Sequence, residues 1–147
     1  MVNIIKRFSG KYSFLSNFYP CKIIYENIRY PSVEHAYQAS KTLDINLRKE
    51  IASQKTPALA KKLGRAIKLR SDWDRVKLSI METLVRLKFT TNEELKKKII
   101  ELENCILIEG NTWGDTFWGV YNGNGKNHLG KILMKVRDDL IRKNIYL

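Results

Sequence analysis

The sequence predicts a mainly α-helical α+β fold, a compact single domain with a small β element. Short β-branched and aromatic runs occupy the first thirty residues, and apolar residues recur at helical spacing after Pro31. The 147 residues suffice to bury a hydrophobic core without disulfides or metals. Because no linker, internal repeat or low-complexity segment interrupts the chain, we expect one domain over residues 1–147.

The β element is expected in short pieces. The segments that read as strands are Asn3–Phe8, Lys22–Tyr25, Ile28–Tyr30 and Cys105–Glu109. Glu26 and Asn27 can turn the chain between two of these strands, which predicts a β-hairpin. The aromatic and polar stretch 12–20 is expected to be a loop.

Helix signals follow Pro31. Ser32 is a suitable N-cap for a helix over Val33–Leu43, and the helix dipole favours Glu34 in its first turn. Pro57 suits the first turn of a second helix, which runs to about Leu63 and which Gly64 is expected to end.

Three residues mark the later helices. Asp72 opens a longer helix, Asn92 precedes a further one, and Asn127 caps the last. The apolar positions that should face the core are Val76, Ile80, Leu84 and Leu87, then Leu95, Ile99 and Leu102, then Leu129, Ile132, Leu133, Val136 and Leu140.

Composition and charge narrow the functional classes. The net charge of +12 attracts phosphorylated small molecules and polyanions alike, although charge runs are commonly solvated helix faces. No apolar run reaches the roughly 18 residues that cross a bilayer, and the N-terminus does not read as a signal peptide. The two cysteines and two histidines lack the spacing of a metal site. We therefore expect a cytoplasmic protein with reduced thiols and with no membrane partner, metal or cofactor.

The segment Glu109–Gly119 is the strongest site signal in the chain. It combines two tryptophans, two carboxylates, an asparagine and three glycines, a mixture that neither a regular helix nor a strand requires. Flat aromatic side chains can hold a planar ring, and Asp115 or Glu109 can transfer protons. The alternative is a structural loop that Trp113 and Trp118 hold in place.

A second signal lies on the helix that follows Ser32. Glu34, Gln38 and Lys41 share one helix face and could supply an acid or base, a positioning amide and a nucleophile. The alternative for this face is a solvent-exposed polar stripe. Trp73, near the start of a later helix, could belong to the core or could cover a ligand.

Six segments, in order, resemble the NADAR domain family, whose members are also called YbiA-like proteins. They are Phe14–Pro20, Pro31–Lys41, Lys62–Arg65, Asp72–Asp74 with Lys77, Met81, Lys88 and Phe89, Glu109–Gly119, and Gly125–Arg137. The resemblance covers essentially the whole chain. It implies a mainly helical YbiA-like domain that hydrolyses N-glycosidic bonds.

Two substrate classes are implied by the resemblance. Some members of the family act on phosphorylated ribosylamino-pyrimidine intermediates of riboflavin synthesis, and others remove ADP-ribose from guanine bases. An ADP-ribosylated nucleic acid therefore also qualifies as a substrate. The alternative is a non-catalytic basic module that binds nucleic acid or ADP-ribose, since such modules combine positive charge with exposed aromatics.

The resemblance also suggests roles for individual residues. Glu34 is expected to be the catalytic acid or base, and Asp115 to stabilise charge or activate water. Lys41 could form a Schiff base with an opened sugar, or it could contact phosphate or ribose. The residues expected to bind substrate are Arg7 and Arg65 at phosphate, Asn17 and Asn127 at the sugar or the base edge, Trp113 and Trp118 at the base, and also Phe18, Gln38 and Trp73.

Overall fold

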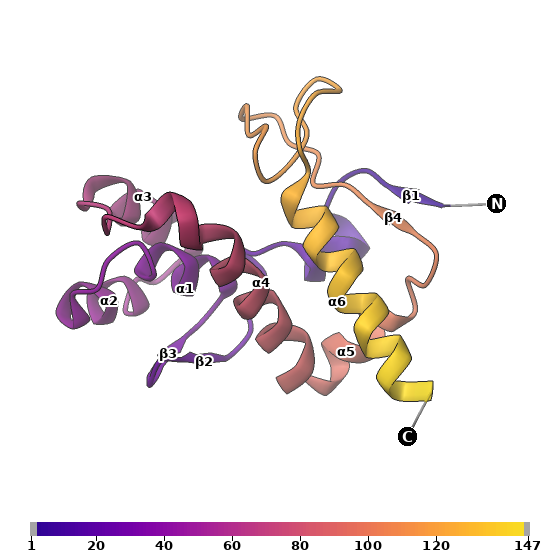
Figure 1. The fold of residues 1–147 in the computed structure, drawn as a ribbon, viewed down its shortest axis with the longest axis horizontal. Helices are drawn as coiled ribbons and strands as arrows, with labels where there is room; N and C mark the ends of the chain where they lie inside the picture. The colour runs from indigo at the N-terminus through magenta and orange to yellow at the C-terminus, as the bar shows by residue number, and fades with distance from the viewer. Residues whose placement is uncertain (1–2, 146–147) are drawn as a thin grey trace. The chain divides into compact units, whose positions relative to one another are not determined.

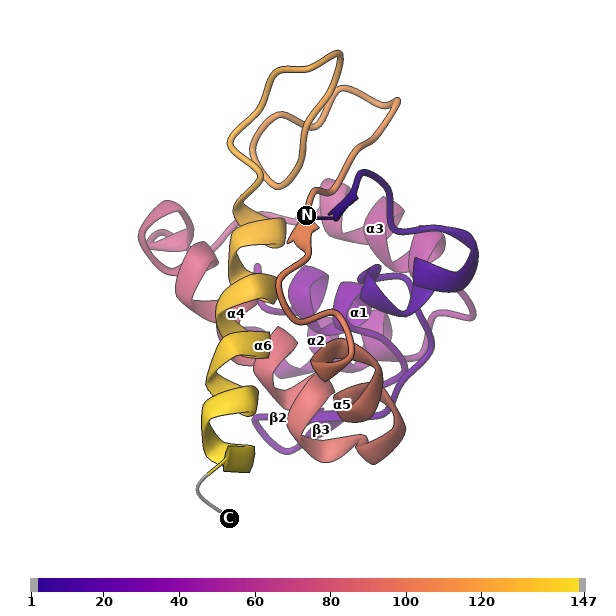
Figure 2. The ribbon, with the colours of Figure 1, turned by 90° about the vertical axis from the view of Figure 1, so that its right-hand side faces the viewer.

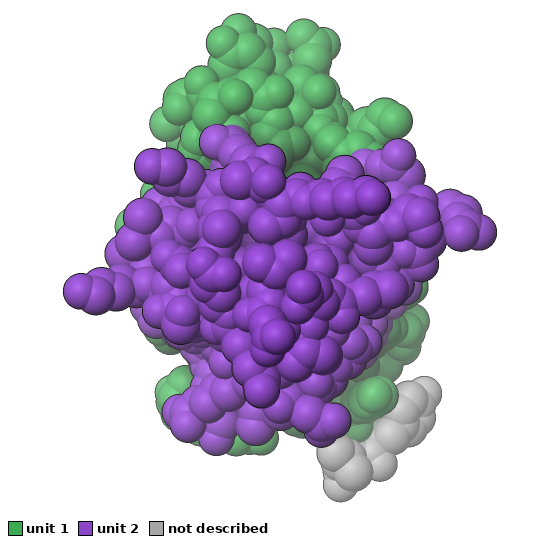
Figure 3. Space-filling view, turned by 90° about the vertical axis from the view of Figure 1, so that its left-hand side faces the viewer, with its two compact units in different colours: residues 1–16, 93–147 green, residues 17–92 purple. Residues whose placement is uncertain are grey.

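The computed structural model describes residues 3–145 and shows a mainly helical chain with little β structure (Figures 1 and 2), which confirms the predicted α+β class. The chain divides into two compact units. One comprises Met1–Ser16 with Glu93–Leu147, and the other comprises Asn17–Asn92 (Figure 3). Each unit is described separately below, and the single domain over residues 1–147 stays a prediction.

The second unit begins with the predicted hairpin. Strand β2 (Ile23–Tyr25) pairs antiparallel with β3 (Ile28–Tyr30). Glu26 and Asn27 connect the strands with φ angles of 48° and 67°, the left-handed conformation that two-residue hairpin turns need.

Helix α1 (Val33–Ala39) starts at the predicted N-cap but ends before Leu43. A helix that the sequence analysis missed, α2 (Ile45–Ala52), follows it. The Asp44 side chain accepts hydrogen bonds from the main-chain nitrogens of Asn46 and Leu47, at 2.9 and 3.2 Å. Asp44 therefore caps a new helix where the prediction had only a connection.

Helix α3 (Pro57–Ala66) runs through Gly64, so the prediction that Gly64 ends this helix is wrong. Gly64 is buried within α3, where it packs against the Gln38 side chain of α1 and does not end the helix. Helix α4 (Trp73–Thr91) confirms the long helix predicted to open at Asp72. Ile80 and Leu84 are buried as expected.

The first unit contains the second sheet and the last helices. Strand β1 (Ile4–Ile5) pairs in parallel with β4 (Ile106–Leu107), and both are shorter than predicted. The remaining elements are the 3₁₀ helix η1 (Gly10–Leu15), helix α5 (Glu93–Ile100) and helix α6 (His128–Ile145). The five apolar residues predicted to line the last helix are all buried, which confirms that stripe.

Candidate active site

The N-terminus of α1 is anchored by four polar contacts within the second unit. Ser32 Oγ accepts a hydrogen bond from the main-chain nitrogen of His35 at 3.1 Å. The main-chain nitrogen of Glu34 donates to the Asn17 carbonyl at 3.0 Å. His35 Nε2 lies 2.9 Å from the Gln54 carbonyl and its Nδ1 lies 2.7 Å from Ser32 Oγ. These contacts place Glu34 in the first turn of a firmly held helix.

Glu34 and Gln38 are buried side by side. Only 7% of Glu34 and 3% of Gln38 is exposed, so the alternative of a solvent-exposed polar stripe is wrong for these two residues. Gln38 Nε2 donates to Glu34 Oε1 at 2.7 Å. Burial raises the pKa of the Glu34 carboxyl, while the Gln38 hydrogen bond and nearby positive charges lower it in part. A carboxyl in this environment holds its proton at higher pH than an exposed one.

Lys41 lies in the turn that follows α1, outside the predicted helix face, and is half-buried. Burial lowers the pKa of its amine, the charge of Glu34 opposes that shift, and the positive charges of Arg65 and Lys61 add to it. A larger fraction of the Lys41 amine is therefore neutral than for an exposed lysine. A neutral amine is a nucleophile, whereas an ammonium group is not.

Helix α3 supplies the other two cations. Lys61 and Arg65 lie one helical turn apart, and both act electrostatically on Glu34. The sequence analysis predicted Arg65 and missed Lys61, although the spacing of four residues places both on one face. We call Glu34, Gln38, Lys41, Lys61 and Arg65 the Glu34 cluster.

Residues preceding the hairpin contact this region. Phe18 is exposed, and Lys61 Nζ lies 6.0 Å from the centroid of its ring. Asn17 Nδ2 donates to Met81 Sδ at 3.5 Å, and its carbonyl holds Glu34 as described. The predicted residues Asn17 and Phe18 are thus tied to α1 and α3.

Trp73 is buried, and its ring centroid lies 5.2 Å from that of Tyr37. This contact supports the core role that was weighed for Trp73 against a ligand-covering role. Trp73 is therefore not among the residues that we propose to contact substrate.

The first unit carries the aromatic loop, residues 109–127. Asp115 Oδ1 accepts hydrogen bonds from the main-chain nitrogens of Phe117 and Trp118, at 3.0 and 2.9 Å. Asn111 pairs with the main chain of Asp115 in both directions, Nδ2 donating at 2.9 Å and Oδ1 accepting at 3.0 Å. Asp115 therefore holds the loop in its conformation, a structural role that the sequence analysis considered only for Trp113 and Trp118.

The two loop tryptophans differ in exposure. Trp113 is 63% exposed and follows directly on Thr112, while Gly114 after it adopts a φ of 86°. Trp118 is half-buried, and its ring centroid lies 4.8 Å from that of Phe117 and 6.4 Å from that of His128. Trp113 thus exposes most of its ring surface to solvent, whereas Trp118 packs against Phe117 and His128 within its own unit.

Asn127 is the last residue of the aromatic loop, and Arg7 lies beside the loop. Asn127 Oδ1 accepts from the main-chain nitrogen of Glu109 at 3.0 Å, and its Nδ2 donates to the Leu107 carbonyl at 2.9 Å. These bonds join the strand to the start of α6, and the predicted contact of Asn127 with the sugar or the base edge stays a prediction. Arg7 is exposed and lies beside Gly110: a Cβ atom built on Gly110 would lie 3.4 Å from Arg7 Cγ.

The predicted residues thus form two groups. The second unit brings together Glu34, Gln38, Lys41 and Arg65 with Asn17 and Phe18, and the first unit brings Arg7 beside the loop that carries Asp115, Trp113 and Trp118. That Glu34 and Asp115 share one pocket stays a prediction.

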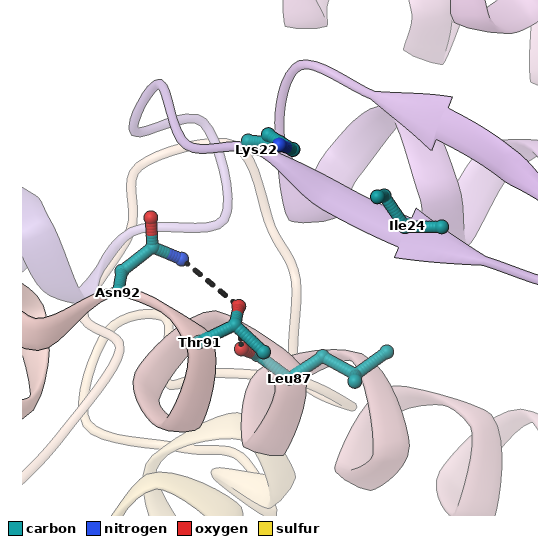
Figure 4. A pocket seen from close by; sticks show the side chains of 5 residues that line it. All are labelled: Lys22, Ile24, Leu87, Thr91 and Asn92. Atoms are coloured by element: carbon teal, nitrogen blue, oxygen red, sulfur yellow. Dashed lines mark hydrogen bonds between the residues drawn. The ribbon is translucent and has the colours of Figure 1, made fainter.

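A cavity of about 250 Å³ lies elsewhere in the second unit, between β2 and the end of α4 (Figure 4). Its lining residues are Lys22, Ile24, Leu87, Thr91 and Asn92. Thr91 Oγ1 donates to the Leu87 carbonyl at 2.7 Å, so this hydroxyl already bonds within α4. The lining contains no member of the Glu34 cluster, and we therefore do not assign the chemistry to this cavity.

One further buried amine was not predicted. Lys88 on α4 is 1% exposed, and burial lowers its pKa to about 8. Its Nζ lies 5.1 Å from the Phe89 ring centroid and 5.6 Å from that of Tyr19. Burial raises the pKa of the neighbouring Cys21 thiol, so the thiolate is disfavoured there.

Two findings concern metals and membranes. Across residues 3–145, no group of three or more His, Cys, Asp or Glu side chains could hold a metal ion. In the same range, no helix is both long and apolar enough to cross a membrane.

Named relatives match most of the chain. N-glycosidase YbiA of Escherichia coli (strain K12) is 36% identical over 135 residues, which cover 90% of this chain and 84% of the relative. An N-glycosidase of Nostoc punctiforme is 38% identical, with 88% and 86% covered. A riboflavin biosynthesis protein of Vibrio vulnificus is 37% identical over 88% of this chain, but the match spans only 36% of its length.

A solved structure matches the fold as well. The NMR structure of the E. coli protein YbiA superposes with a TM-score of 0.87 and 34% identity, over 99% of this chain and 89% of the other. The sequence model of the NADAR domain family matches residues 5–141 of this chain. This chain therefore belongs to the NADAR domain family.

Proposed function

We propose that this chain is an N-glycosidase that hydrolyses the bond between a ribose carbon and a nitrogenous base. The observation that carries the proposal is the Glu34 cluster: a buried carboxyl with a raised pKa, bonded to an amide and surrounded by Lys41, Lys61 and Arg65. The names of the relatives from Escherichia coli and Nostoc punctiforme, both N-glycosidases, support the same reaction class.

The chemistry follows from these side chains. Cleavage of the C1′–N bond passes through an oxocarbenium-like state, in which the sugar gains positive charge and the base nitrogen needs a proton. Glu34, whose pKa burial raises, donates that proton, and as a carboxylate it then deprotonates the attacking water. The products are the free base and a sugar with a hydroxyl at C1′. Asp115 contributes negative charge near the sugar in this scheme.

The substrate carries phosphate in this proposal. Arg65 and Lys61 lie on α3 within electrostatic reach of Glu34, and Arg7 is exposed beside the aromatic loop. Guanidinium groups bind phosphate oxygens well. Trp113 supplies an exposed aromatic face for the base. The two substrate classes are a phosphorylated ribosylamino-pyrimidine of riboflavin synthesis and ADP-ribosylated guanine.

Lys41 has two candidate roles. As a neutral amine it attacks C1′ of a ring-opened imine, the base leaves as its amine, and water then hydrolyses the lysine imine. As an ammonium group it contacts phosphate or ribose. The lowered pKa of Lys41 favours the first role, while the surrounding cations suit the second.

To test the proposed activity, the purified protein is incubated separately with three kinds of substrate: the riboflavin-pathway intermediates, an ADP-ribosylated guanine nucleotide and ADP-ribosylated DNA. We expect mass analysis to detect a released base and sugar from at least one, and Glu34→Gln to abolish that release. Salt-sensitive retention of nucleic acid with no product from any substrate would instead identify a non-catalytic binding module.

A further inference from the structure

We propose that Gln38 is a positioning residue for Glu34, and that its side-chain amide bonds to the Glu34 carboxyl in both protonation states. Gly64 provides the space in which this amide lies. The inference rests on the proposed function, because it assigns Gln38 to the proton transfer by Glu34 and not to contact with substrate.

The orientation of the Gln38 amide follows from its partners. Nε2 donates to Glu34 Oε1 at 2.7 Å, whereas Oε1 of Gln38 is buried and has no hydrogen-bond partner among the described residues. An ionised carboxylate can only accept hydrogen bonds, so the NH₂ group must face it. The amide therefore adopts the orientation that the charged form of Glu34 requires, although this leaves a buried acceptor unpaired.

Protonation of Glu34 reverses this requirement. A protonated carboxyl has an O–H donor, and a half-turn of the Gln38 amide about its last side-chain bond presents Oε1 as the acceptor. Lysine or arginine at this position would bond only to the ionised form, because neither has an acceptor. A glutamine can thus hold the Glu34 carboxyl in one place before and after proton transfer.

Gly64 is the residue that makes room for this amide. A Cβ added there would lie 2.0 Å from Gln38 Oε1, 2.8 Å from Cδ and 2.9 Å from Cβ. Glycine weakens a helix interior relative to alanine, so Gly64→Ala would favour α3 if intrinsic helix propensity alone counted. The close contact reverses this expectation, because the added methyl group must displace the amide from Glu34.

The experiment compares Gln38→Met and Gly64→Ala with the natural protein in kcat and KM across pH. Methionine matches glutamine in length but offers no comparable hydrogen bond. We expect kcat to fall by about 10- to 100-fold, the effect of losing one hydrogen bond to a charged group, with KM unchanged. Since the Gln38 amide donates to ionised Glu34 as it lies but must turn before it accepts from the protonated form, the ionised form gains more from Gln38. The limb of the pH profile that reports Glu34 should therefore move to higher pH in both variants.

A matched control is Gln54→Met, which removes a side-chain amide in the same unit. Gln54 bonds through Nε2 to the Glu50 carbonyl at 3.1 Å, and the change leaves its own main-chain carbonyl in place. We expect this variant to keep the natural pH profile. If Gln38→Met does not fold, Gly64→Ala carries the same test with α1 intact.

Two results would overturn the inference. A raised KM with unchanged kcat in Gln38→Met would show that Gln38 contacts substrate. Reduced stability in Gly64→Ala without any change in the pH profile would show a purely structural contact. A ¹³C NMR titration of the Glu34 carboxyl, in the natural protein and in Gln38→Met, requires no turnover. A higher Glu34 pKa in the variant would therefore support the inference even if the proposed reaction fails.

Discussion

Asp115 can be separated into a loop-forming residue and a catalytic charge by two substitutions. Asp115→Ala removes the oxygen that accepts from the main-chain nitrogens of Phe117 and Trp118. Asp115→Asn keeps an oxygen at that position but removes the negative charge. The two variants therefore change the loop geometry and the charge independently.

The magnitudes follow from these two bonds. Each neutral or charge-assisted hydrogen bond contributes about 1 kcal/mol net at a half-exposed site, so Asp115→Ala should lower the free energy of unfolding by about 2 kcal/mol. For a chain of this size, that loss corresponds to roughly 4–8 °C in Tm. Asp115→Asn should lose less than about 1 kcal/mol, because the amide oxygen still accepts. If the charge stabilises the oxocarbenium-like state, kcat should fall about 100-fold or more in Asp115→Asn.

The assays are thermal unfolding and steady-state turnover on each purified variant. The control is Asp74→Asn, the same chemical change at an exposed residue that pairs with Lys77 at 3.3 Å. It should leave Tm and kcat nearly unchanged. Equal stability of Asp115→Ala and Asp115→Asn would refute the loop-forming argument, and near-natural turnover in Asp115→Asn would remove Asp115 from the catalytic residues.

Three further predictions concern other parts of the chain. Trp73→Ala should cost about 3–5 kcal/mol of unfolding free energy in urea titrations, whereas Trp113→Ala should leave stability intact and weaken substrate binding by about 1–3 kcal/mol; equal losses of stability would contradict this contrast. If Lys41 forms the imine, Lys41→Arg should abolish turnover, and borohydride added to the natural protein during turnover should leave an adduct on Lys41 that mass analysis detects. An active arginine variant, together with no adduct on the natural protein, would leave the phosphate or ribose contact as the role of Lys41. Burial lowers the pKa of His35, so the unfolded chain takes up this proton at higher pH than the folded chain does. The contribution of His35 to the free energy of unfolding should therefore be complete above the unfolded pKa of about 6.5 and be lost as the pH falls below it. A His35→Gln variant whose stability keeps the same pH dependence between pH 7.5 and 5 would exclude His35 as the cause.

The His35 prediction has a geometric basis. The Gln54 carbonyl can only accept, so His35 Nε2 carries the proton and Nδ1 accepts from the Ser32 hydroxyl. A second proton on Nδ1 reverses that hydrogen bond, so that the Ser32 hydroxyl accepts from the ring, and it places a positive charge on a buried imidazole at the N-cap of α1. Acid should therefore loosen the helix that carries Glu34.

Local signals in the sequence predicted much of the secondary structure. The hairpin turn at Glu26 and Asn27, the N-cap at Ser32 and the apolar stripe of α6 depend on neighbouring residues, and all three are confirmed. The errors arose where tertiary contacts decide. Gly64 reads as a helix end, but its packing against Gln38 keeps it inside α3.

The sequence by itself determined the helical class, the shared helix face of Glu34 and Gln38, and, through its motifs, the family. These depend on residue spacing along the chain, which helix geometry converts directly into a common face. Only the tertiary structure decided that Glu34 is buried and that Lys61 acts on it, because burial and charge proximity arise when α3 packs on α1. It also assigned Asn127 to main-chain partners eighteen and twenty positions away, contacts that no local pattern encodes.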